Sequence, residues 1–393
     1  MKTMPAIYPN LLTSVLAAAG SMLLALVLTG CVEQSDEARD SDVMLEGEPA
    51  LKDVFAGSFT VGASLNEWQV TGRSPREIEI VEKHFSTVTT ENALKWENVH
   101  PEPGRYDFDI ADRIVEFGEV HGMTVIGHTL VWHNQTPRWV FEDGDGNPVS
   151  RDTLLARMQD HIATVVGRYR GRIDGWDVVN EPWDDDGALR DSPWRQIIGD
   201  DYIAKAFEYA YEADPDAGLY LNDYSLPNEA RRDGAVATIK SLQEQGVPVT
   251  GIGMQGHYQL DWPSPEQLNS ALEAFGALGI EVMITELDVN VLPQVSLGAE
   301  ITDTVAWKAE IDPYKEGLPD EVQQLLALKY EELFQAFVEH DDVITRVTFW
   351  GVSDRSSWKN DWPVFGRTNY PLLFDREGKP KPAFYAVVDA GTP

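Results

Sequence analysis

From residue 51 onward, short runs of apolar and β-branched residues alternate with polar loops and with longer stretches whose apolar residues recur at helical spacing. This alternation is typical of parallel β/α architecture, in which a helix follows each strand and covers the sheet. Eight runs have the composition of strands. They are residues 60–65, 87–91, 124–132, 173–180, 218–224, 252–258, 281–289 and 344–352.

Several helices between these runs have recognisable starts. Ser74-Pro75-Arg76-Glu77 and Ser264-Pro265-Glu266-Gln267 each combine a capping-box pattern with a proline at the first helical position. Other helices are predicted to begin near Ser150, Asp200 and Asn228. Residues 321–339 keep apolar residues at helical spacing throughout and are expected to form the longest helix.

Eight strand and helix units in about 340 residues match a single (β/α)8 TIM barrel with enlarged loops better than an open doubly wound sheet. We therefore predict an α/β fold with one barrel domain over residues 51–393. Such barrels carry their chemistry at the C-terminal ends of the strands. The predicted strand ends of this chain do concentrate polar and aromatic residues, namely Glu91-Asn92, His128, Trp132-His133, Asn180-Glu181-Pro182-Trp183, Asn222-Asp223-Tyr224, Gln255-Gly256-His257, Glu286-Leu287-Asp288 and Trp350.

The N-terminal fifty residues follow a different pattern. Residues 11–28 form an uncharged apolar run behind a single basic residue, Lys2, as in an export signal. The run ends in Leu28-Thr29-Gly30-Cys31, which resembles the bacterial lipoprotein signal box, where small residues precede a cysteine that is lipidated and becomes the mature N-terminus. An uncleaved membrane anchor and an ordinary signal peptide are the alternatives, because the run is just long enough to span a bilayer.

An acidic stretch links this run to the barrel. Residues 32–50 contain seven acids and one Arg and show no apolar periodicity, which is typical of a solvated tether. We therefore predict a lipoprotein signal peptide at residues 1–30 and a lipidated Cys31 followed by a disordered linker over residues 31–50. The protein is expected to be exported and held at the bacterial cell envelope by this lipid anchor.

Composition and charge narrow the function classes. The chain is 43% hydrophobic and 10% aromatic, enough to bury a sizeable core. Its 65 acids against 31 Lys and Arg give a net charge of -34, and removing residues 1–50 still leaves 58 acids against 29 basic residues. This charge disfavours a nucleic-acid partner. Cys31 is the only cysteine, so neither an intrachain disulfide nor a Cys-based zinc site is expected.

Two glutamates have the placement of catalytic groups. Glu181 follows the apolar run 176–180, and Glu286 follows the run 282–285, at the ends of the fourth and seventh predicted strands. Across the mouth of a closed barrel these positions face one another. Paired carboxylates perform glycoside hydrolysis, in which one is protonated to assist the leaving oxygen and the other is ionised. The alternative is that each glutamate forms a structural ion pair at a loop base.

The motifs around these glutamates resemble those of a known family. Trp176-Asp177-Val178-Val179-Asn180-Glu181 and Ile284-Thr285-Glu286-Leu287-Asp288 are similar to the acid/base and nucleophile motifs of glycoside hydrolase family 10 endo-β-1,4-xylanases. The resemblance covers nearly all of residues 51–393. It includes Glu91-Asn92-Ala93-Leu94-Lys95-Trp96, Gly127-His128-Thr129-Leu130-Val131-Trp132-His133, Gln255-Gly256-His257 and Phe349-Trp350-Gly351.

The resemblance implies a role for each matching residue. Glu181 would be the general acid/base and Glu286 the nucleophile of a retaining double displacement on xylan or xylo-oligosaccharides, while His257 and Asp288 would support the nucleophile. Asn180 would bond the sugar 2-hydroxyl, and Tyr224 would lie beyond the cleavage point. The sugar-binding subsites on the non-reducing side would contain Glu91, Asn92, Lys95, His128, Trp132, Gln255, Trp350 and Trp358.

Two patterns that suggest other ligands are incomplete. Residues 251–256 fit the GxGxxG spacing but do not lead into a helix, so no dinucleotide site is expected. Residues 143–147 resemble the start of a calcium loop, yet Pro148 and Leu154 stand where Gly and Glu are required. No His-Glu-x-x-His motif occurs. We therefore predict neither a metal nor a cofactor. The sequence also indicates no obligate protein partner.

Other functions on the same barrel remain open at this point. A β-1,4-glucanase or mannanase would share the two-glutamate arrangement, and a catalytically dead barrel would retain only sugar capture. Trp350 and Trp358 would distinguish a xylanase from a glucanase or mannanase, because their crowding at the sugar C5 position would exclude the hydroxymethyl group that glucose carries. The presence of both glutamates argues against a catalytically dead barrel.

Overall fold

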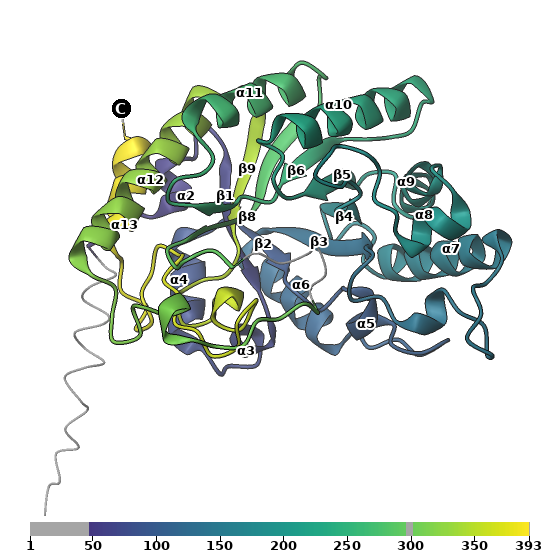
Figure 1. Ribbon diagram of the computed structural model, residues 1–393, viewed down its shortest axis with the longest axis horizontal. Coiled ribbons are helices and arrows are strands. Elements are labelled where there is room, and N and C mark those ends of the chain that lie inside the picture. The colour runs from purple at the N-terminus through teal and green to yellow at the C-terminus, as the bar shows by residue number, and fades with distance from the viewer. Residues whose placement is uncertain (1–46, 296–301, 393) are drawn as a thin grey trace, which may run out of the picture. The chain divides into compact units, whose positions relative to one another are not determined.

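Parallel strands form a closed ring at the centre of the fold (Figure 1). The computed structural model describes residues 47–295 and 302–392. In these residues the strand order is β6-β5-β4-β3-β2-β1-β9-β8-β7, and the pairing of β6 with β8 closes the ring. The predicted (β/α)8 barrel is thereby confirmed. The predicted signal peptide, Cys31 and most of the acidic linker fall on residues 1–46, outside the described residues.

The strands lie close to the predicted runs. Their bounds are β1 (Thr60–Leu65), β2 (Thr87–Thr90), β3 (Thr124–Val131), β4 (Gly175–Asn180), β5 (Gly218–Asp223), β6 (Gly251–Met254), β7 (His257–Gln259), β8 (Glu281–Asn290) and β9 (Ile344–Phe349). Most strand positions are buried, as expected where the barrel interior covers one face and helices cover the other.

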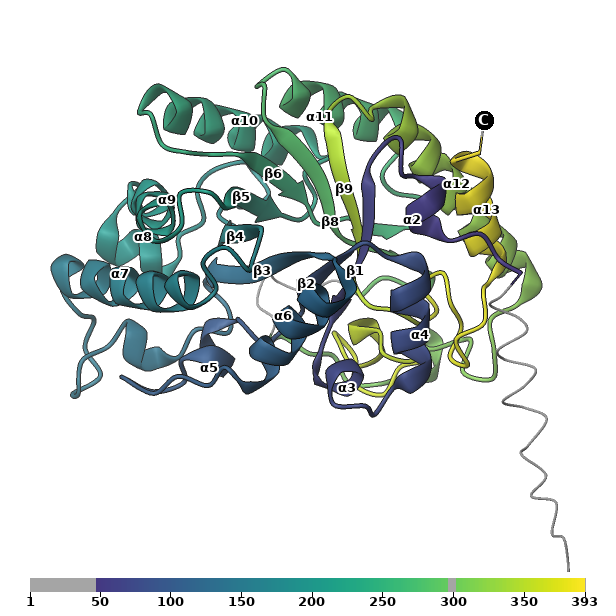
Figure 2. The ribbon, with the colours of Figure 1, turned by 180° about the vertical axis from the view of Figure 1, so that it is seen from behind.

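Helices surround the ring on its outside (Figure 1) and are seen from behind in Figure 2. They are α2 (Leu51–Val54), α3 (Glu67–Val70), α4 (Pro75–His84), α5 (Trp96–Val99), α6 (Asp109–His121), α7 (Arg151–Arg168), α8 (Pro193–Ile198), α9 (Tyr202–Ala213), α10 (Glu229–Glu244), α11 (Pro265–Gly276), α12 (Asp320–Glu339) and α13 (Pro382–Ala390). Short 3-10 helices occur at Arg138–Val140, Ala309–Ile311 and Trp358–Asn360. As predicted, the segment ending at Glu339 forms the longest described helix, α12. No helix within residues 47–295 and 302–392 is long and apolar enough to cross a membrane.

Helix α12 contacts both the start and the end of the described chain, and α2 and α13 lie near it in both views (Figures 1 and 2). Phe55, directly after α2, stacks on Phe59 with ring centroids 5.0 Å apart and lies 5.2 Å from the ring of Phe334 in α12. Helix α13 packs against α12. These aromatic contacts complete the helical layer between the last and first strands.

The sixth predicted strand differs from expectation because it is broken in two. Residues 252–258 were expected to form one strand, but β6 ends at Met254 and β7 begins at His257, with Gly256 between them at a φ of +84°. Both pieces pair with β8, which shifts register relative to β9 in the same region. Glu286 N–H donates to the carbonyl of Gln255 at 2.6 Å. The break therefore lies beside Glu286.

The two predicted capping boxes have different outcomes. At α11, Ser264 accepts from the Gln267 N–H and the Gln267 side chain accepts from the Ser264 N–H, so that box is confirmed. Helix α4 does begin at Pro75, but the Ser74 side chain makes no capping hydrogen bond, and that box was wrong.

The capping box at α4 is absent because Glu77, the glutamate that would complete it, has other hydrogen-bond partners. The Glu77 carboxylate is buried and accepts hydrogen bonds from Gln69, Ser353 and Ser356. These tertiary partners, which come from α3 and from the loop after β9, occupy the carboxylate that the box requires. The predicted start near Ser150 is confirmed, since α7 begins at the next residue and Ser150 accepts from the Thr153 N–H.

Candidate active site

A cleft of about 910 Å³ lies at the C-terminal ends of the strands. Most of the predicted site residues line it, although they come from distant parts of the chain. Those lining residues are Lys95, His128, Trp132, Asn180, Glu181, Tyr224, Gln255, His257, Glu286, Trp350 and Trp358. Asn290 at the end of β8 and the start of the long segment that follows, through Pro293, Gln294 and Val295, add to one wall.

Glu181 directly follows β4 and is held by neutral donors. Its backbone has a φ of +56°, an uncommon conformation for a residue with a side chain, and its N–H donates to the Asn222 carbonyl at 2.7 Å. Trp132 Nε1 donates to Glu181 Oε2 at 2.9 Å, and Gln255 Nε2 donates to Glu181 Oε1 at 3.1 Å. Both carboxyl oxygens are thus fixed.

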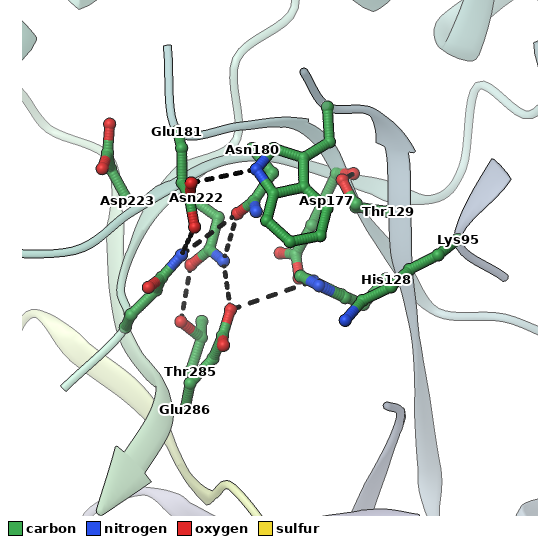
Figure 3. Close-up of polar contacts among 12 residues, drawn as sticks. Lys95, His128, Thr129, Asp177, Asn180, Glu181, Asn222, Asp223, Thr285 and Glu286 are labelled. Carbon is green, nitrogen blue, oxygen red and sulfur yellow. Dashed lines mark hydrogen bonds and ion pairs between the residues drawn. The ribbon is translucent and has the colours of Figure 1, made fainter. Parts of the chain in front are cut away.

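Glu286 lies within β8 and has a more cationic environment. Asn222 Nδ2 donates to Glu286 Oε1 at 2.7 Å, and His257 Nε2 lies 3.1 Å from Glu286 Oε2. His128 Nδ1 is a further 4.0 Å contact to Oε1. Figure 3 shows Glu181 and Glu286 converging from their separate strands, with Asn222 between them.

These surroundings shift the two carboxyl pKa values in opposite directions. Burial raises the pKa of Glu181, and the nearby charge of Glu286 adds to the rise. Burial alone would also raise the pKa of Glu286. There, however, the hydrogen bond from His257 and the charges of His128, His257 and Lys95 outweigh burial and hold the pKa below its usual value. Such a pair can supply one protonated acid and one ionised carboxylate at the same pH.

His257 connects Glu286 to a fully buried carboxylate. His257 Nδ1 forms an ion pair with Asp288 Oδ1 at 3.1 Å, while its Nε2 contacts Glu286. Burial opposes the charged ring, but the charge and hydrogen bond of Asp288, together with the hydrogen bond to Glu286, outweigh burial and raise the pKa of His257. Asp288 also accepts from Trp358 Nε1 at 2.8 Å and pairs with Lys359 at 3.3 Å. Asp288 therefore lies behind the cleft wall and acts on the site through His257.

The predicted site residues in the loop after β2 form a connected chain of polar contacts. Lys95 Nζ donates to Asn92 Oδ1 at 2.9 Å and lies 5.1 Å from the Trp132 ring centroid. Asn92 Nδ2 in turn donates to Glu91 Oε1 at 3.1 Å. Burial lowers the pKa of Lys95 despite the surrounding carboxylates and raises the pKa of Glu91. Of these three, only Lys95 lines the cleft, while Asn92 lines a neighbouring hollow.

Aromatic side chains form much of the remaining wall. Trp350 meets His128 edge to face at 5.1 Å, and His128 Nδ1 lies 2.9 Å from Asp177 Oδ2. Trp358 stacks on Trp362, with centroids 5.0 Å apart. The Tyr224 hydroxyl accepts a hydrogen bond from Arg190 at 3.1 Å. Rings beside fixed donors and acceptors suit a ligand with both apolar faces and hydroxyl groups.

The sequence pattern did not single out Asn222 as a site residue. Its Nδ2 donates both to Glu286 and to Asn180 Oδ1, the latter at 2.9 Å, and its Oδ1 accepts from Thr285 at 2.6 Å. Asn222 is fully buried at the end of β5. Its position in the strand-end group Asn222-Asp223-Tyr224 was the available signal.

Two more residues near Glu181 were also missed. Arg190 is buried and donates from Nε to the Glu181 carbonyl at 3.0 Å. Asp223 is fully buried and pairs with Arg231 at 2.8 Å, and burial raises the pKa of Asp223 to about 7. Asp223 shares the strand-end signal of Asn222, whereas no pattern in the sequence distinguishes Arg190 from a residue in a structural ion pair. In residues 47–295 and 302–392, no group of three or more His, Cys, Asp or Glu side chains is arranged to hold a metal ion.

The chain is similar to several known proteins. Residues 50–390 match the family model described as Glycosyl hydrolase family 10. Endo-1,4-beta-xylanase A of Xylanibacter ruminicola is 44% identical over 345 residues, which cover 87% of this chain and 94% of that protein. Endo-1,4-beta-xylanase of Geobacillus stearothermophilus is 44% identical over 353 residues, which cover 88% of this chain and 100% of that protein.

The structural comparison agrees with the sequence comparison. A solved structure described as a novel GH10 endoxylanase from a sugarcane soil metagenome superposes with a TM-score of 0.83 and 44% identity, covering 88% of this chain and 100% of that chain. The similarity therefore extends over the whole barrel, including the strands that carry Glu181 and Glu286. The prediction of a glycoside-hydrolysing enzyme is confirmed, because the chain belongs to glycosyl hydrolase family 10.

Proposed function

We propose that this protein is an endo-1,4-β-xylanase that hydrolyses β-1,4-xylosidic bonds in xylan or xylo-oligosaccharides with retention of configuration. The observation that carries the proposal is the pair of buried glutamates in one cleft, whose pKa values are shifted in opposite directions. The names of the similar proteins from Xylanibacter ruminicola and Geobacillus stearothermophilus support the choice of xylan.

In the first step Glu286 attacks the anomeric carbon while Glu181 donates its proton to the leaving glycosidic oxygen. A covalent glycosyl-enzyme forms on Glu286 and the alcohol leaves. The ionised state of Glu286 is favoured by His257, Asn222 and the nearby cations. The protonated state of Glu181 is favoured by burial and by the negative charge of Glu286.

In the second step the charge on Glu286 is absent, because that carboxylate is esterified to the sugar. The repulsion that helps to raise the pKa of Glu181 is then lost, so this pKa falls and the ionised carboxylate, which can accept a proton, is favoured. It takes a proton from water as the water attacks the anomeric carbon and releases Glu286. Loss and return of one charge thus switch Glu181 between acid and base.

The remaining residues bind the polymer. Asn180 is held by Asn222 and Gln255 in a position to bond the 2-hydroxyl of the sugar at the cleavage point. Trp350 and Trp358 close the cleft wall and select xylose by excluding the hydroxymethyl group on C5 of glucose. Lys95, Trp132 and His128 hold sugars on the non-reducing side, with Glu91 and Asn92 behind them, and Tyr224 contacts the sugar on the other side.

The decisive experiment measures reducing-sugar release from soluble xylan and from carboxymethylcellulose. We expect cleavage of xylan alone and a loss of more than about 10³-fold in the Glu286→Ala variant, because the nucleophile is removed. Glu273→Ala is the matched control. It replaces an exposed glutamate on α11 and should keep full activity. Equal cleavage of both polymers would indicate a glucanase instead. No cleavage by folded enzyme would indicate a sugar-binding protein.

We also propose that Cys31 is lipidated and holds the enzyme at the bacterial cell envelope. The support is the uncharged apolar run that ends in Leu28-Thr29-Gly30-Cys31 and the acidic segment that follows it. The full chain expressed in bacteria should partition into the detergent phase after extraction, whereas a Cys31→Ala variant should lose the lipid. An equal detergent partition of both proteins would point to an uncleaved apolar anchor.

A further inference from the structure

A second hollow of about 480 Å³ lies beside the catalytic cleft and has no role in the mechanism above. It is lined by Asn66, Glu67, Trp68, Asn92, Ala93, Asn98, Asp107 and Ile110. Three of these side chains carry amides, two carry carboxylates and one is an indole. Carbohydrate sites use this combination, because an aromatic face takes the apolar side of a pyranose while amides and carboxylates bond its hydroxyls.

The hollow is connected to the cleft through shared residues. Asn92 lines the hollow and accepts a hydrogen bond from Lys95, which lines the cleft. Glu91 links the two walls, since Asn66 Nδ2 donates to its Oε2 at 2.7 Å and Asn92 Nδ2 donates to its Oε1. The hollow is therefore separated from the cleft only by the contacts of Lys95, Asn92 and Glu91.

Trp68 presents its indole to this hollow and is 53% exposed. A single exposed apolar side chain is common on protein surfaces and has no meaning by itself. This one is held in place. The guanidinium of Arg73 lies 5.6 Å from the ring centroid of Trp68, and Arg73 is fixed by an ion pair with Glu67 at 2.9 Å.

The backbone under Trp68 is also fixed. Asn66 caps the short helix α3 by accepting from the Trp68 N–H at 2.9 Å, and the Gln69 side chain accepts from the Asn66 N–H at 2.9 Å. Gln69 is buried and donates to Glu77 at 2.8 Å. An exposed aromatic residue on so constrained a turn loses little conformational freedom when a ligand stacks on it.

We propose that Trp68 is the platform of an additional sugar-binding subsite, which takes a main-chain pyranose of the substrate beyond the sugar held by Lys95, on the far side of Asn92. This inference rests on the proposed function, which places those two residues on the non-reducing side of the cleavage point. The subsite extends the bound length of the polymer and favours long chains over short ones.

The test compares wild type with Trp68→Ala on unbranched xylo-oligosaccharides from xylotriose to xylohexaose. We expect kcat/KM to fall about tenfold on the longest substrate, mainly through KM, as for a truncated aromatic anchor. The shortest cleaved substrate, which cannot reach the hollow, should change less than about twofold. Trp68→Phe should restore part of the loss. Tyr211→Ala, which removes a 47% exposed aromatic residue on α9, should leave all substrates unchanged.

Two outcomes would overturn the subsite. An equal loss on every chain length would mean that Trp68 only maintains structure, and no loss on any length would mean that no sugar binds there. If wild type cleaves none of the substrates, the proposed function fails. Calorimetric binding of xylohexaose in the Glu286→Ala background then decides the subsite separately. Equal affinity with and without Trp68 rejects it, and about tenfold weaker binding without Trp68 supports it.

Discussion

The side chains around the two glutamates determine which carboxyl group is ionised. Both groups are buried, and burial alone raises a carboxyl pKa. The carboxyl group of Glu181 receives hydrogen bonds from the neutral donors Trp132 and Gln255, whereas that of Glu286 contacts His257 and lies near further cations. The difference between the two glutamates is therefore set by the charge of the neighbours.

The opposite pKa shifts predict a bell-shaped dependence of kcat/KM on pH. Glu286 acts only when ionised, so activity falls as pH drops through its lowered pKa. Glu181 acts only when protonated in the first step, so activity falls as pH rises through its raised pKa. Initial rates on a xylo-oligosaccharide across the pH range test this. A profile without two limbs, over a range in which circular dichroism shows a folded enzyme, contradicts the assignment.

Asn222 gives a sharper test at the same scale. Asn222→Ala removes a donor that stabilises the ionised form of Glu286, so the pKa of Glu286 should rise and the acid limb should move to higher pH. We expect kcat to fall by roughly 10 to 100-fold, the usual effect of losing a buried charge-assisted bond. Asn147→Ala, in an exposed turn outside the cleft, is the control. If kcat falls but the acid limb of the pH profile stays at the same pH, Asn222 contributes to packing and does not affect the pKa of Glu286.

At the level of strands and helices, local periodicity predicted most of what the structure contains. The ring of strands and the starts of α7 and α11 follow from apolar spacing and capping residues, which are local properties. The break between β6 and β7 does not, because it depends on pairing with β8, thirty residues away in the sequence. The missing cap at Ser74 has a similar cause, since Glu77 binds Ser353 and Ser356 from the end of the barrel.

The same limit applies to the candidate site. The strand ends located its residues, because the C-terminal rim of a parallel barrel is fixed by the order of strands and helices. The partner of each side chain was not predictable in this way. Asn222 bonds Asn180 and Glu286 from two other strands, and no spacing along the chain encodes those contacts.

The break between β6 and β7 depends on one residue, Gly256. An added Cβ would lie 2.8 Å from Ile284 Cγ2, and the φ of +84° disfavours any side chain. Gly256→Ala should therefore lower the free energy of unfolding by about 2 kcal/mol. It should also lower activity, because Gln255 and His257 flank the glycine. Chemical denaturation and initial rates measure the two effects.

Gly246 is the matched control for this change. It also has a positive φ, of +75°, but nothing lies within 4 Å of an added Cβ, and it is far from the cleft residues. Gly246→Ala should show only the backbone strain, about 1 kcal/mol, with full activity. Equal destabilisation by the two changes would mean that the contact with Ile284 is not important.

For the whole molecule, the dominant property is the excess of acidic residues. Residues 51–393 contain 58 acids against 29 basic residues, and this excess repels polyanions. Asp185 and Asp261 place exposed carboxylates on the cleft wall itself. A neutral xylan chain meets no such barrier, whereas a xylan substituted with glucuronate does. We therefore expect the net charge to disfavour anionic substrates at low ionic strength and to lose this effect at high ionic strength.

This expectation predicts that salt raises activity on an anionic substrate and leaves activity on a neutral substrate nearly unchanged. Between about 20 and 200 mM NaCl the Debye length falls from roughly 20 Å to roughly 7 Å, so repulsion of an anionic polymer is largely screened. We expect kcat/KM on glucuronate-substituted xylan to rise several-fold, while kcat/KM on a neutral xylo-oligosaccharide stays within about twofold. Thermal unfolding at each salt concentration controls for changes in stability. If both substrates respond equally, salt acts on the protein and the excess of acids does not select the substrate.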